Sequence, residues 1–302
     1  MHNKGFLRQI KEQKISFLFI APVVLLFVVF VLGPLTASFY WSFTEYNGIH
    51  APKWVGLANY KAIFFDDPRF WKSVLNTVLY TAGVIPAGVI ISLLLAMAVN
   101  RKIRFRQFFR AVYFIPAVTS VIALSVIWKW LFAGDKYGLI NYWLINMGFK
   151  PVDWLMSPVW TLPAIIIMSI WAGIGYNMIL FLAGLQTIPA TVYEAADIDG
   201  ASQWDKFWKI TLPLLKPTMV FVVVMGFITS FQVFEQIYIM TESEFGIGGV
   251  LDSALTVVAY LYDMGFRKFQ MGYASALGYI IFAVIFLVTI INIKFIKTKV
   301  EY

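Results

Sequence analysis

Six long apolar runs, separated by short polar segments, divide the chain along its whole length. They cover about residues 17–40, 74–99, 112–132, 159–185, 218–240 and 271–293. Each run has roughly the 20 residues that a helix needs to cross the hydrocarbon core of a bilayer. The first run is longer than the apolar part of a signal peptide and lacks a small-residue cleavage site, so we expect it to remain as a span. The pattern predicts an all-α integral membrane protein with six transmembrane helices.

The basic residues gather in alternate polar segments. Fifteen of the 24 Lys and Arg lie in the N-terminal tail, in residues 101–110, in the segment before the fifth run, and after the last run. Eight lie in the other segments, and Lys129 stands near the end of the third run, where its side chain can reach the headgroups. Because Lys and Arg are enriched in cytoplasmic loops, we expect both termini in the cytoplasm. The chain then divides into a basic cytoplasmic tail, residues 1–15, and a six-span domain, residues 16–302.

Composition supports a membrane protein and excludes several kinds of site. Hydrophobic residues make up 60% of the 302 residues and charged residues only 13%, and the mean hydropathy is +0.77. Membrane orientation explains the net charge of +8 better than nucleic-acid binding does. The absence of cysteine excludes disulfides, thiolate metal sites and a cysteine nucleophile. His2 and His50 lie far apart in the sequence, so we expect no metal site.

The polar segments are too short to form a catalytic domain. None exceeds about 35 residues, and a chain of that length rarely builds a stable core alone. The sequence also lacks a phosphate-binding P-loop, a His-Glu-x-x-His zinc helix and a Gly-x-Ser-x-Gly elbow. We therefore expect no enzyme activity, and any energy for transport must come from another chain. The lack of an internal repeat disfavours an inverted-repeat secondary transporter.

The segment at residues 187–217 is the longest polar interval on the predicted cytoplasmic side. Its pattern predicts two short amphipathic helices that meet at Gly200, where glycine permits a sharp turn. Thr191, with Glu194 three residues later, is predicted to cap the first helix, and Ser202 to cap the second. Such a helix pair suits a docking element between two spans. An amphipathic loop that lies on the headgroups is the alternative interpretation.

This segment resembles the cytoplasmic signature of permease subunits of binding-protein-dependent ABC importers. The resemblance rests on Glu194-Ala195-Ala196, three residues, Gly200, nine residues, Ile210, one residue and then Leu212-Pro213. Other motifs resemble the carbohydrate branch that includes the maltose and glycerol-3-phosphate permeases. These are GLANY at 56–60, Asn76-Thr77 at the start of the second run and GLIN at 138–141.

The resemblance implies the type I permease fold of these importers and a set of partners. The chain would be the pore-forming subunit in a bacterial or archaeal cell (inner) membrane, paired with a second permease. Two ATPase subunits would bind its cytoplasmic face, and an extracytoplasmic solute-binding protein would deliver a carbohydrate. No cofactor is expected on this chain, since ATP and Mg²⁺ would bind the ATPase. The residues expected to couple it to that ATPase are Glu194, Ala195, Ala196, Asp199, Gly200, Ile210, Leu212 and Pro213.

Polar residues within two predicted spans suggest a substrate path. In the fifth run, Thr229, Gln232, Glu235 and Gln236 follow one helical stripe, and polar groups inside a span are functional candidates. The fourth run adds Trp171, Tyr176 and Asn177, which suit stacking on a sugar ring and bonding its hydroxyls. Two interpretations of Glu235 remain open, because its carboxylate can face the path or pair with a neighbouring helix.

One segment departs from the family pattern, and the substrate stays open. The family usually follows its fifth span with Thr, a short spacer and Gly-Gly-Pro. Here Gly248-Gly249 come late after Thr241, and no proline follows. Alternative functions are import of a polyol, glycerol phosphate or amino acid, a channel or secondary transporter, and a membrane enzyme. In the sixth run, Tyr273, Ser275 and Tyr279 are weaker path candidates, and its small residues favour close helix packing.

Overall fold

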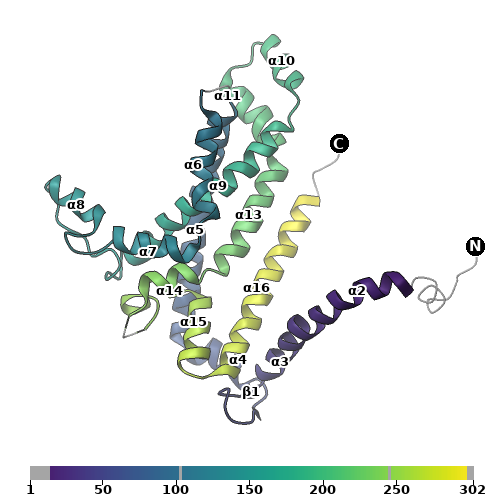
Figure 1. Cartoon of the computed structure of the whole chain (residues 1–302), viewed down its shortest axis with the longest axis vertical. Helices are drawn as coiled ribbons and strands as arrows, with labels where there is room; N and C mark the ends of the chain where they lie inside the picture. Colours follow the sequence, from purple (N-terminus) through teal and green to yellow (C-terminus); the bar gives the residue numbers. More distant parts are fainter. Residues whose placement is uncertain (1–13, 102–103, 244–245, 298–302) are drawn as a thin grey trace, which may run out of the picture.

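A computed structural model describes residues 14–101, 104–243 and 246–297. The long helices run between two ends of an elongated molecule (Figure 1). They are α2 (Lys14–Phe27), which continues through η1 (Val28–Leu32) into α3 (Gly33–Trp41), then α5 (Pro68–Asn100), α9 (Thr161–Gln186), α13 (Lys216–Phe231) and α16 (Met271–Lys297).

Shorter elements connect the long helices. Before α9 they are β1 (Thr44–Glu45), β2 (Lys53–Trp54), α4 (Ala58–Lys61), η2 (Ala62–Asp66), α6 (Arg106–Val118), α7 (Val121–Leu131) and α8 (Leu139–Asn146). After α9 they are α10 (Ala190–Ile198), α11 (Gln203–Lys206), η3 (Phe207–Thr211), α12 (Leu212–Leu214), α14 (Glu235–Thr241), η4 (Val250–Asp252), α15 (Val257–Tyr262) and η5 (Asp263–Arg267). The two strands pair antiparallel.

Four described helical segments are long and apolar enough to cross a membrane: Leu18–Trp41, Pro68–Asn100, Thr161–Gln186 and Met271–Ile291. Two further pairs of helices pass the same test together, although each pair is bent. They are Arg106–Val118 with Val121–Leu131, bent by 97°, and Gln203–Leu214 with Lys216–Phe231, bent by 64°. Counting each bent pair as one span gives six, the number that the sequence predicted, although the second pair begins at Gln203, well before the predicted run at 218–240.

The third predicted span is therefore not one straight helix. Thr119 has an extended backbone and Ser120 a non-helical one at the end of α6, and the chain turns there into α7. The Thr119 hydroxyl donates to the carbonyl of Ile115 at 2.8 Å. Such local side-chain bonds compete with the helix ladder, which gives a physical reason for a break at two hydroxyl residues.

The fifth predicted span is also broken. Helix α13 ends at Phe231, and residues 232–234 leave the helical conformation before α14 begins at Glu235. The Thr256 hydroxyl donates to the freed Val233 carbonyl at 3.1 Å, so a distant loop stabilises the break. The prediction of a continuous polar stripe from Thr229 to Gln236 was wrong, because the two ends of that stripe lie on different helices.

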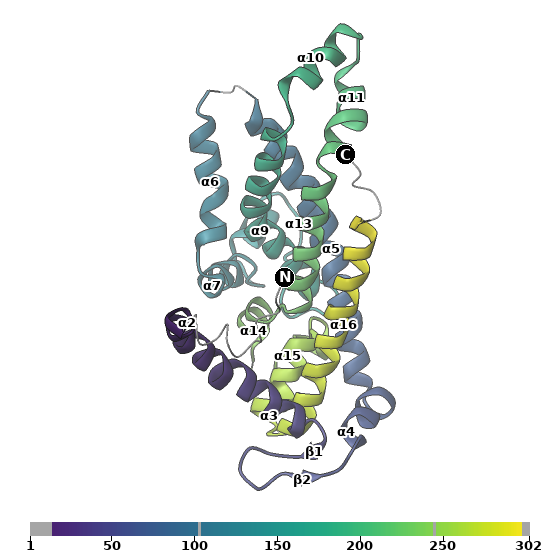
Figure 2. The same cartoon turned by 90° about the vertical axis from the view of Figure 1, so that its right-hand side faces the viewer.

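Two of the polar segments lie at opposite ends of the molecule (Figures 1 and 2), and the segment with α8 projects to one side between them (Figure 1). Helices α10 and α11 form one end, close to the last turns of α5 and the start of α6. The β1–β2 hairpin and α4 lie at the other end. Helices α2 and α3 lead away from the body, and the window of the N-terminal span has no buried residue.

Two apolar clusters hold the helices together. The larger one joins α5, α7, α9, α14, α15 and α16, and the second lies nearer to α10, between α5, α9 and α13. Two glycines permit close approach of neighbouring elements. A Cβ on Gly175 of α9 would lie 2.0 Å from the Tyr113 carbonyl oxygen of α6, and one on Gly272 of α16 would lie 2.0 Å from the carbonyl oxygen of Thr44. This contact of α16 agrees with the packing role predicted for the small residues of the sixth run.

Three asparagines from the sequence motifs bind backbone groups. The Asn59 amide donates to the carbonyls of residues 42 and 44, both at 2.9 Å. The Asn76 amide donates to the carbonyls of residues 252 and 255 at 2.8 and 3.0 Å. The Asn141 amide donates to the carbonyls of residues 133 and 152 at 3.0 and 2.9 Å. In this structure the motif asparagines fix loops against helices.

Candidate functional site

Helices α10 and α11, with η3 and α12, form a hairpin at one end of the molecule. Helix α10 begins at Ala190 after Pro189, and no side chain caps it, so the predicted cap at Thr191 was wrong. Pro189 has an extended backbone that already directs the chain into the helix. Ser202 does cap α11, because its hydroxyl accepts from the Asp205 amide at 3.1 Å. We call residues 190–214 the coupling hairpin.

Gly200 makes the turn of the coupling hairpin, as predicted. Its φ of +73° lies in the left-handed region that glycine adopts without strain. The amide of Ala201 donates to the Ala196 carbonyl at 2.9 Å, which closes the end of α10. No atom lies within 4 Å of the place that a Cβ would take at Gly200. The backbone conformation, rather than crowding, is therefore what requires glycine at this position.

Side-chain contacts across the turn hold the two halves of the hairpin together. The Lys206 ammonium pairs with the Asp197 carboxylate; the lysine side chain is buried and the aspartate is exposed. Tyr193 and Thr211 share a hydrogen bond of 2.9 Å between their hydroxyls. Because each contact joins α10 to the segment after Gly200, the hairpin can move as one body.

The outer surface of the hairpin combines exposed acids, among them Glu194 and Asp199, with large apolar side chains. Glu194 is exposed, and in the described part of the chain its carboxylate has no hydrogen-bond or ion-pair partner. Ile198, Trp204 and Trp208 are 88%, 69% and 50% exposed. Exposed apolar side chains around a free carboxylate are typical of a surface that binds another protein. Sequence reasoning missed Ile198 and Trp204, although the amphipathic pattern contained them.

The remaining coupling candidates differ in exposure. Ala195, Asp199, Gly200 and Pro213 are exposed, Ile210 and Leu212 are half-buried, and Ala196 is buried. The buried alanine permits α10 to pack closely, and the exposed residues leave its outer side free. The coupling role of these residues stays a prediction.

A cavity of about 320 Å³ lies between α5, α6, α7, α9, α13 and α14. Its polar lining consists of hydroxyl, phenol and amide groups, and none of the described lining residues is charged. The polar residues are Tyr80, Thr119, Ser169, Tyr176, Asn177, Thr229, Ser230 and Gln236. Such a lining can exchange hydrogen bonds with an uncharged polar molecule.

The structure brings four of the seven substrate-path candidates into this cavity. Tyr176, Asn177, Thr229 and Gln236 line it, whereas Trp171, Gln232 and Glu235 are exposed and lie outside the lining. The Trp171 ring contacts the ring of Trp128, with 5.5 Å between centroids. Sequence reasoning missed four polar lining residues: Tyr80 of α5, Thr119 just after α6, Ser169 of α9 and Ser230 of α13. Ser169 stands seven residues before Tyr176, two helical turns along the same face, which is the signal that identifies it.

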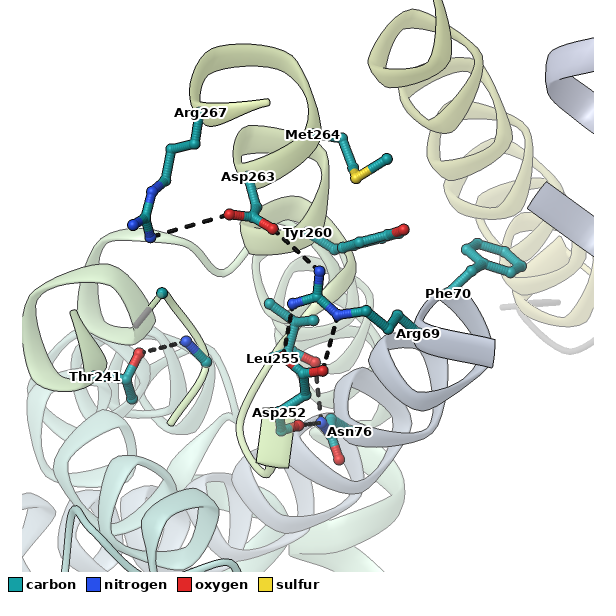
Figure 3. Close-up of polar contacts among 12 residues, drawn as sticks. Arg69, Phe70, Asn76, Thr241, Asp252, Leu255, Tyr260, Asp263, Met264 and Arg267 are labelled. Carbon is teal, nitrogen blue, oxygen red and sulfur yellow. Dashed lines mark hydrogen bonds and ion pairs between the residues drawn. The ribbon is translucent and has the colours of Figure 1, made fainter. Parts of the chain in front are cut away.

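Charged residues form a third site, at the start of α5 and in the segment after α14 (Figure 3). The Arg69 guanidinium bonds both oxygens of Asp252, at 2.7 and 2.8 Å, and reaches Asp263 at 3.3 Å. Asp67 caps α5 through one oxygen and accepts the hydroxyls of Tyr260 and Tyr273 on the other. Burial, together with this hydrogen bond to the Asp67 carboxylate, raises the pKa of Tyr260. Tyr273 thus has a structural partner instead of facing the cavity.

Comparison with known proteins places the chain among membrane transport subunits. Residues 88–301 match a family model described as binding-protein-dependent transport system inner membrane component. The chain is 35% identical to the probable ABC transporter permease protein YesP of Bacillus subtilis (strain 168), over 97% of this chain and 93% of YesP. It is 37% identical to the arabinooligosaccharides transport system permease protein AraP of the same organism, over 92% of this chain and 87% of AraP.

A solved structure shows the same fold. A chain of a bacterial ABC transporter involved in the import of the acidic polysaccharide alginate superimposes with a TM-score of 0.85. The match covers 98% of this chain and 99% of that chain, at 21% sequence identity. The six-span arrangement with two bent pairs is therefore the fold of an ABC importer permease.

Proposed function

The chain belongs to the family of binding-protein-dependent transport system inner membrane components, and from that premise we propose that it is the pore-forming subunit of an ATP-driven importer of a neutral carbohydrate. The relatives that cover nearly the whole chain are ABC transporter permeases. AraP is named for arabinooligosaccharides, which supports a saccharide substrate. In this proposal the chain is not an enzyme, and ATP and Mg²⁺ bind a partner ATPase.

The cavity lining is the observation that carries the substrate class. Hydroxyl, phenol and amide groups can bond sugar hydroxyls, and the aromatic ring of Tyr176 offers a face for a pyranose or furanose ring. The described lining holds no cation, so a carboxylate or phosphate inside it would lose its hydration without a counter-ion from this chain. A neutral saccharide therefore fits better than an acidic one, and a polyol is the second candidate, since it presents the same hydroxyls.

The coupling hairpin fits the attachment of the ATPase. Its carboxylate at Glu194 can bond a basic group of the partner, and Ile198 with the two tryptophans can fill an apolar cleft. The contacts across Gly200 make the hairpin rigid, and it continues through α12 into α13, which lines the cavity. Closure of an ATPase dimer on the hairpin would then move α13 and change access to the cavity.

The position of the basic residues supports the orientation in this proposal. Arg101 and Arg104 lie between α5 and α6, and Arg106 begins α6; the connection between these two helices lies at the end that carries the coupling hairpin (Figure 2). The positive-inside rule assigns that end to the cytoplasm, with the binding protein at the opposite end. A second, related permease would complete the pore in a bacterial or archaeal cell membrane.

Co-purification tests the importer assignment. The tagged chain, extracted from its native membranes in mild detergent, is expected to retain an ATPase and a second permease. Glu194→Ala should weaken ATPase attachment about tenfold or more, because a hydrogen bond to a charged group contributes about 1.5–3 kcal/mol. Glu45→Ala, which removes an exposed acid at the opposite end, is the matched control. Recovery of the chain alone, active without ATP, would overturn the assignment in favour of a channel or secondary carrier.

The substrate class has a separate test. The solute-binding protein, which we call the delivery protein, is screened for ligands, and ATP-dependent uptake is then measured in proteoliposomes. Both measurements are expected to show a preference for neutral saccharides over acidic or phosphorylated ones. A preference for an anionic saccharide would contradict the neutral substrate and leave the importer assignment standing. A preference for a linear sugar alcohol would favour the polyol alternative.

A further inference from the structure

A second pocket, of about 820 Å³, lies at the charged site near the start of α5 and shares no residue with the cavity. Its charged lining comes from the start of α5, from η4, and from η5 with the residue that follows it. These residues are Arg69, Asp252, Asp263, Arg267 and Lys268. The rest of the lining comes from Met156 and from seven residues from the end of α14 onward, which are Thr241, Ser243, Gly246, Ile247, Gly249, Val250 and Leu251. The charged groups of this pocket have no role in the proposed transport cavity.

The cations in this pocket exceed the acids, and two of them are weakly paired. Asp252 gives both oxygens to Arg69 at 2.7 and 2.8 Å. Asp263 alone then pairs with three cations: Arg69 at 3.3 Å, Lys268 at 3.5 Å and Arg267 at 4.0 Å. Figure 3 shows its contacts with Arg69 and Arg267. The Asp263 side chain is only 8% exposed, whereas Arg267 and Lys268 are 35% and 43% exposed. These two cations therefore keep unused donors at the pocket.

The wall of the pocket is fixed before any ligand binds. The Gly248 amide donates to the Thr241 hydroxyl at 2.8 Å, and the backbones of Ser243 and Gly246 bond each other at 3.0 and 3.2 Å. Gly248 has a φ of +103°, and a Cβ there would lie 2.8 Å from the Cα of Leu255. Asn76 holds the same loop by two carbonyls. A preorganised pocket loses little entropy when a ligand enters.

We propose that Arg267 and Lys268 form a docking subsite for an Asp or Glu side chain of the solute-binding protein. The inference rests on the proposed function, which puts this pocket on the extracytoplasmic side of the membrane. A carboxylate of the partner could accept hydrogen bonds from the donors of Arg267 and Lys268 that Asp263 does not use. A single negative charge suits the pocket better than a phosphate dianion, because the acids already present would repel the second charge.

Two further observations favour a protein partner. Uncharged loop residues line the pocket beside the charged ones, and its volume of about 820 Å³ leaves room for a short loop of a partner protein. Arg69 joins the subsite to α5, the helix that contributes Tyr80 to the cavity. Docking at this subsite would thus act directly on a helix of the translocation path.

Charge reversal in the assembled transporter tests the subsite. The complex with its ATPase and second permease is placed in nanodiscs, and binding of the delivery protein is measured at low and high salt. Arg267→Glu with Lys268→Glu is expected to weaken binding at least tenfold at low salt and to reduce its salt dependence. Lys150→Glu, an exposed cation in another predicted outer segment, is the control and should leave binding unchanged.

A milder variant and a second readout keep the test decisive. Arg267→Gln with Lys268→Gln removes the charges without adding acids, and should retain basal ATPase activity while losing most of the stimulation by the delivery protein. Replacement of an acid on the delivery protein by Lys should restore binding to the Glu variant. If the Gln variant binds the delivery protein and is stimulated by it as strongly as the wild type, the docking subsite is wrong and the proposed function still stands. No stimulation of the wild-type complex by any delivery protein would overturn the proposed function as well.

Titration with inorganic phosphate distinguishes a simple anion site. Phosphate binding that disappears in the Gln variant, with delivery-protein binding unchanged, would show that the pocket takes a free anion and would overturn the docking role. The docking role is supported if the wild type does not bind phosphate and the Gln variant loses its binding to the delivery protein.

Discussion

Asn76 is buried within α5, yet it acts on the loop after α14 rather than on a ligand. Only 4% of the residue is exposed, and its amide satisfies two backbone carbonyls more than 170 residues away in sequence. Its neighbour Thr77 accepts the Val257 amide at 3.0 Å. A buried carbonyl without a partner is costly, so a small side chain determines the position of a whole loop.

Asn76→Ala should lower the stability of the protein by about 1–3 kcal/mol, because it leaves the buried Leu255 carbonyl without the Asn76 amide, whereas the Asp252 carbonyl still accepts the Leu255 amide. The thermal midpoint in detergent and the rate of proteolysis after residue 241 measure this effect. Asn177→Ala, at an asparagine that lines the cavity, is the comparison and should reduce uptake with little change in the midpoint. Equal midpoints for the Asn76 variant and the wild type would contradict the role given to Asn76.

At the scale of elements, two glycines at positive φ stand in different surroundings. Gly200 has open space where a Cβ would lie, whereas a Cβ at Gly248 would meet the backbone of Leu255. Gly200→Ala should therefore cost about 1–2 kcal/mol from the left-handed backbone alone, and Gly200→Asn less, since asparagine tolerates that region. Gly248→Ala should prevent folding of the loop. Uptake per ATP hydrolysed and the yield of folded protein separate the two effects, and equal behaviour of both Ala variants would contradict them.

The pairing of Lys206 with Asp197 predicts a non-additive mutant cycle within the coupling hairpin. Asp197→Ala leaves a lysine that is only 6% exposed without its partner, and a buried unpaired charge is destabilising. Because Asp197 is largely exposed, the expected loss is about 1–2 kcal/mol. The double variant with Lys206→Met should recover most of it. Thermal midpoints and ATPase retention of the four proteins give the coupling energy, and strict additivity would show that the pair does not join the helices.

At the scale of the whole molecule, the uninterrupted apolar runs predicted the second, fourth and sixth spans. Most of the predicted boundaries lie within a few residues of the helix ends. The break in the third span has a local cause at Thr119 that the prediction overlooked, whereas the break in the fifth span was not predictable from local pattern. The break in the fifth span depends on Thr256, which reaches the Val233 carbonyl from 23 residues away. The same limit applies to the cavity, because Tyr80, Ser169 and Gln236 meet there only after three helices pack. The turn at Gly200 was predictable, since its cause is local.

Labelling of single cysteines tests the orientation on which the coupling and docking proposals both depend. The natural chain has no cysteine, so each variant carries one reactive thiol without further changes. Lys150→Cys should react with a membrane-impermeant maleimide in intact spheroplasts, because we place it outside. Trp204→Cys, on the exposed side of the coupling hairpin, should react only after permeabilisation, and less when the ATPase covers it. The cysteine-free chain gives the background signal. The opposite pattern of labelling would put the hairpin outside the cell and contradict both the ATPase contact and the docking subsite at Arg267 and Lys268.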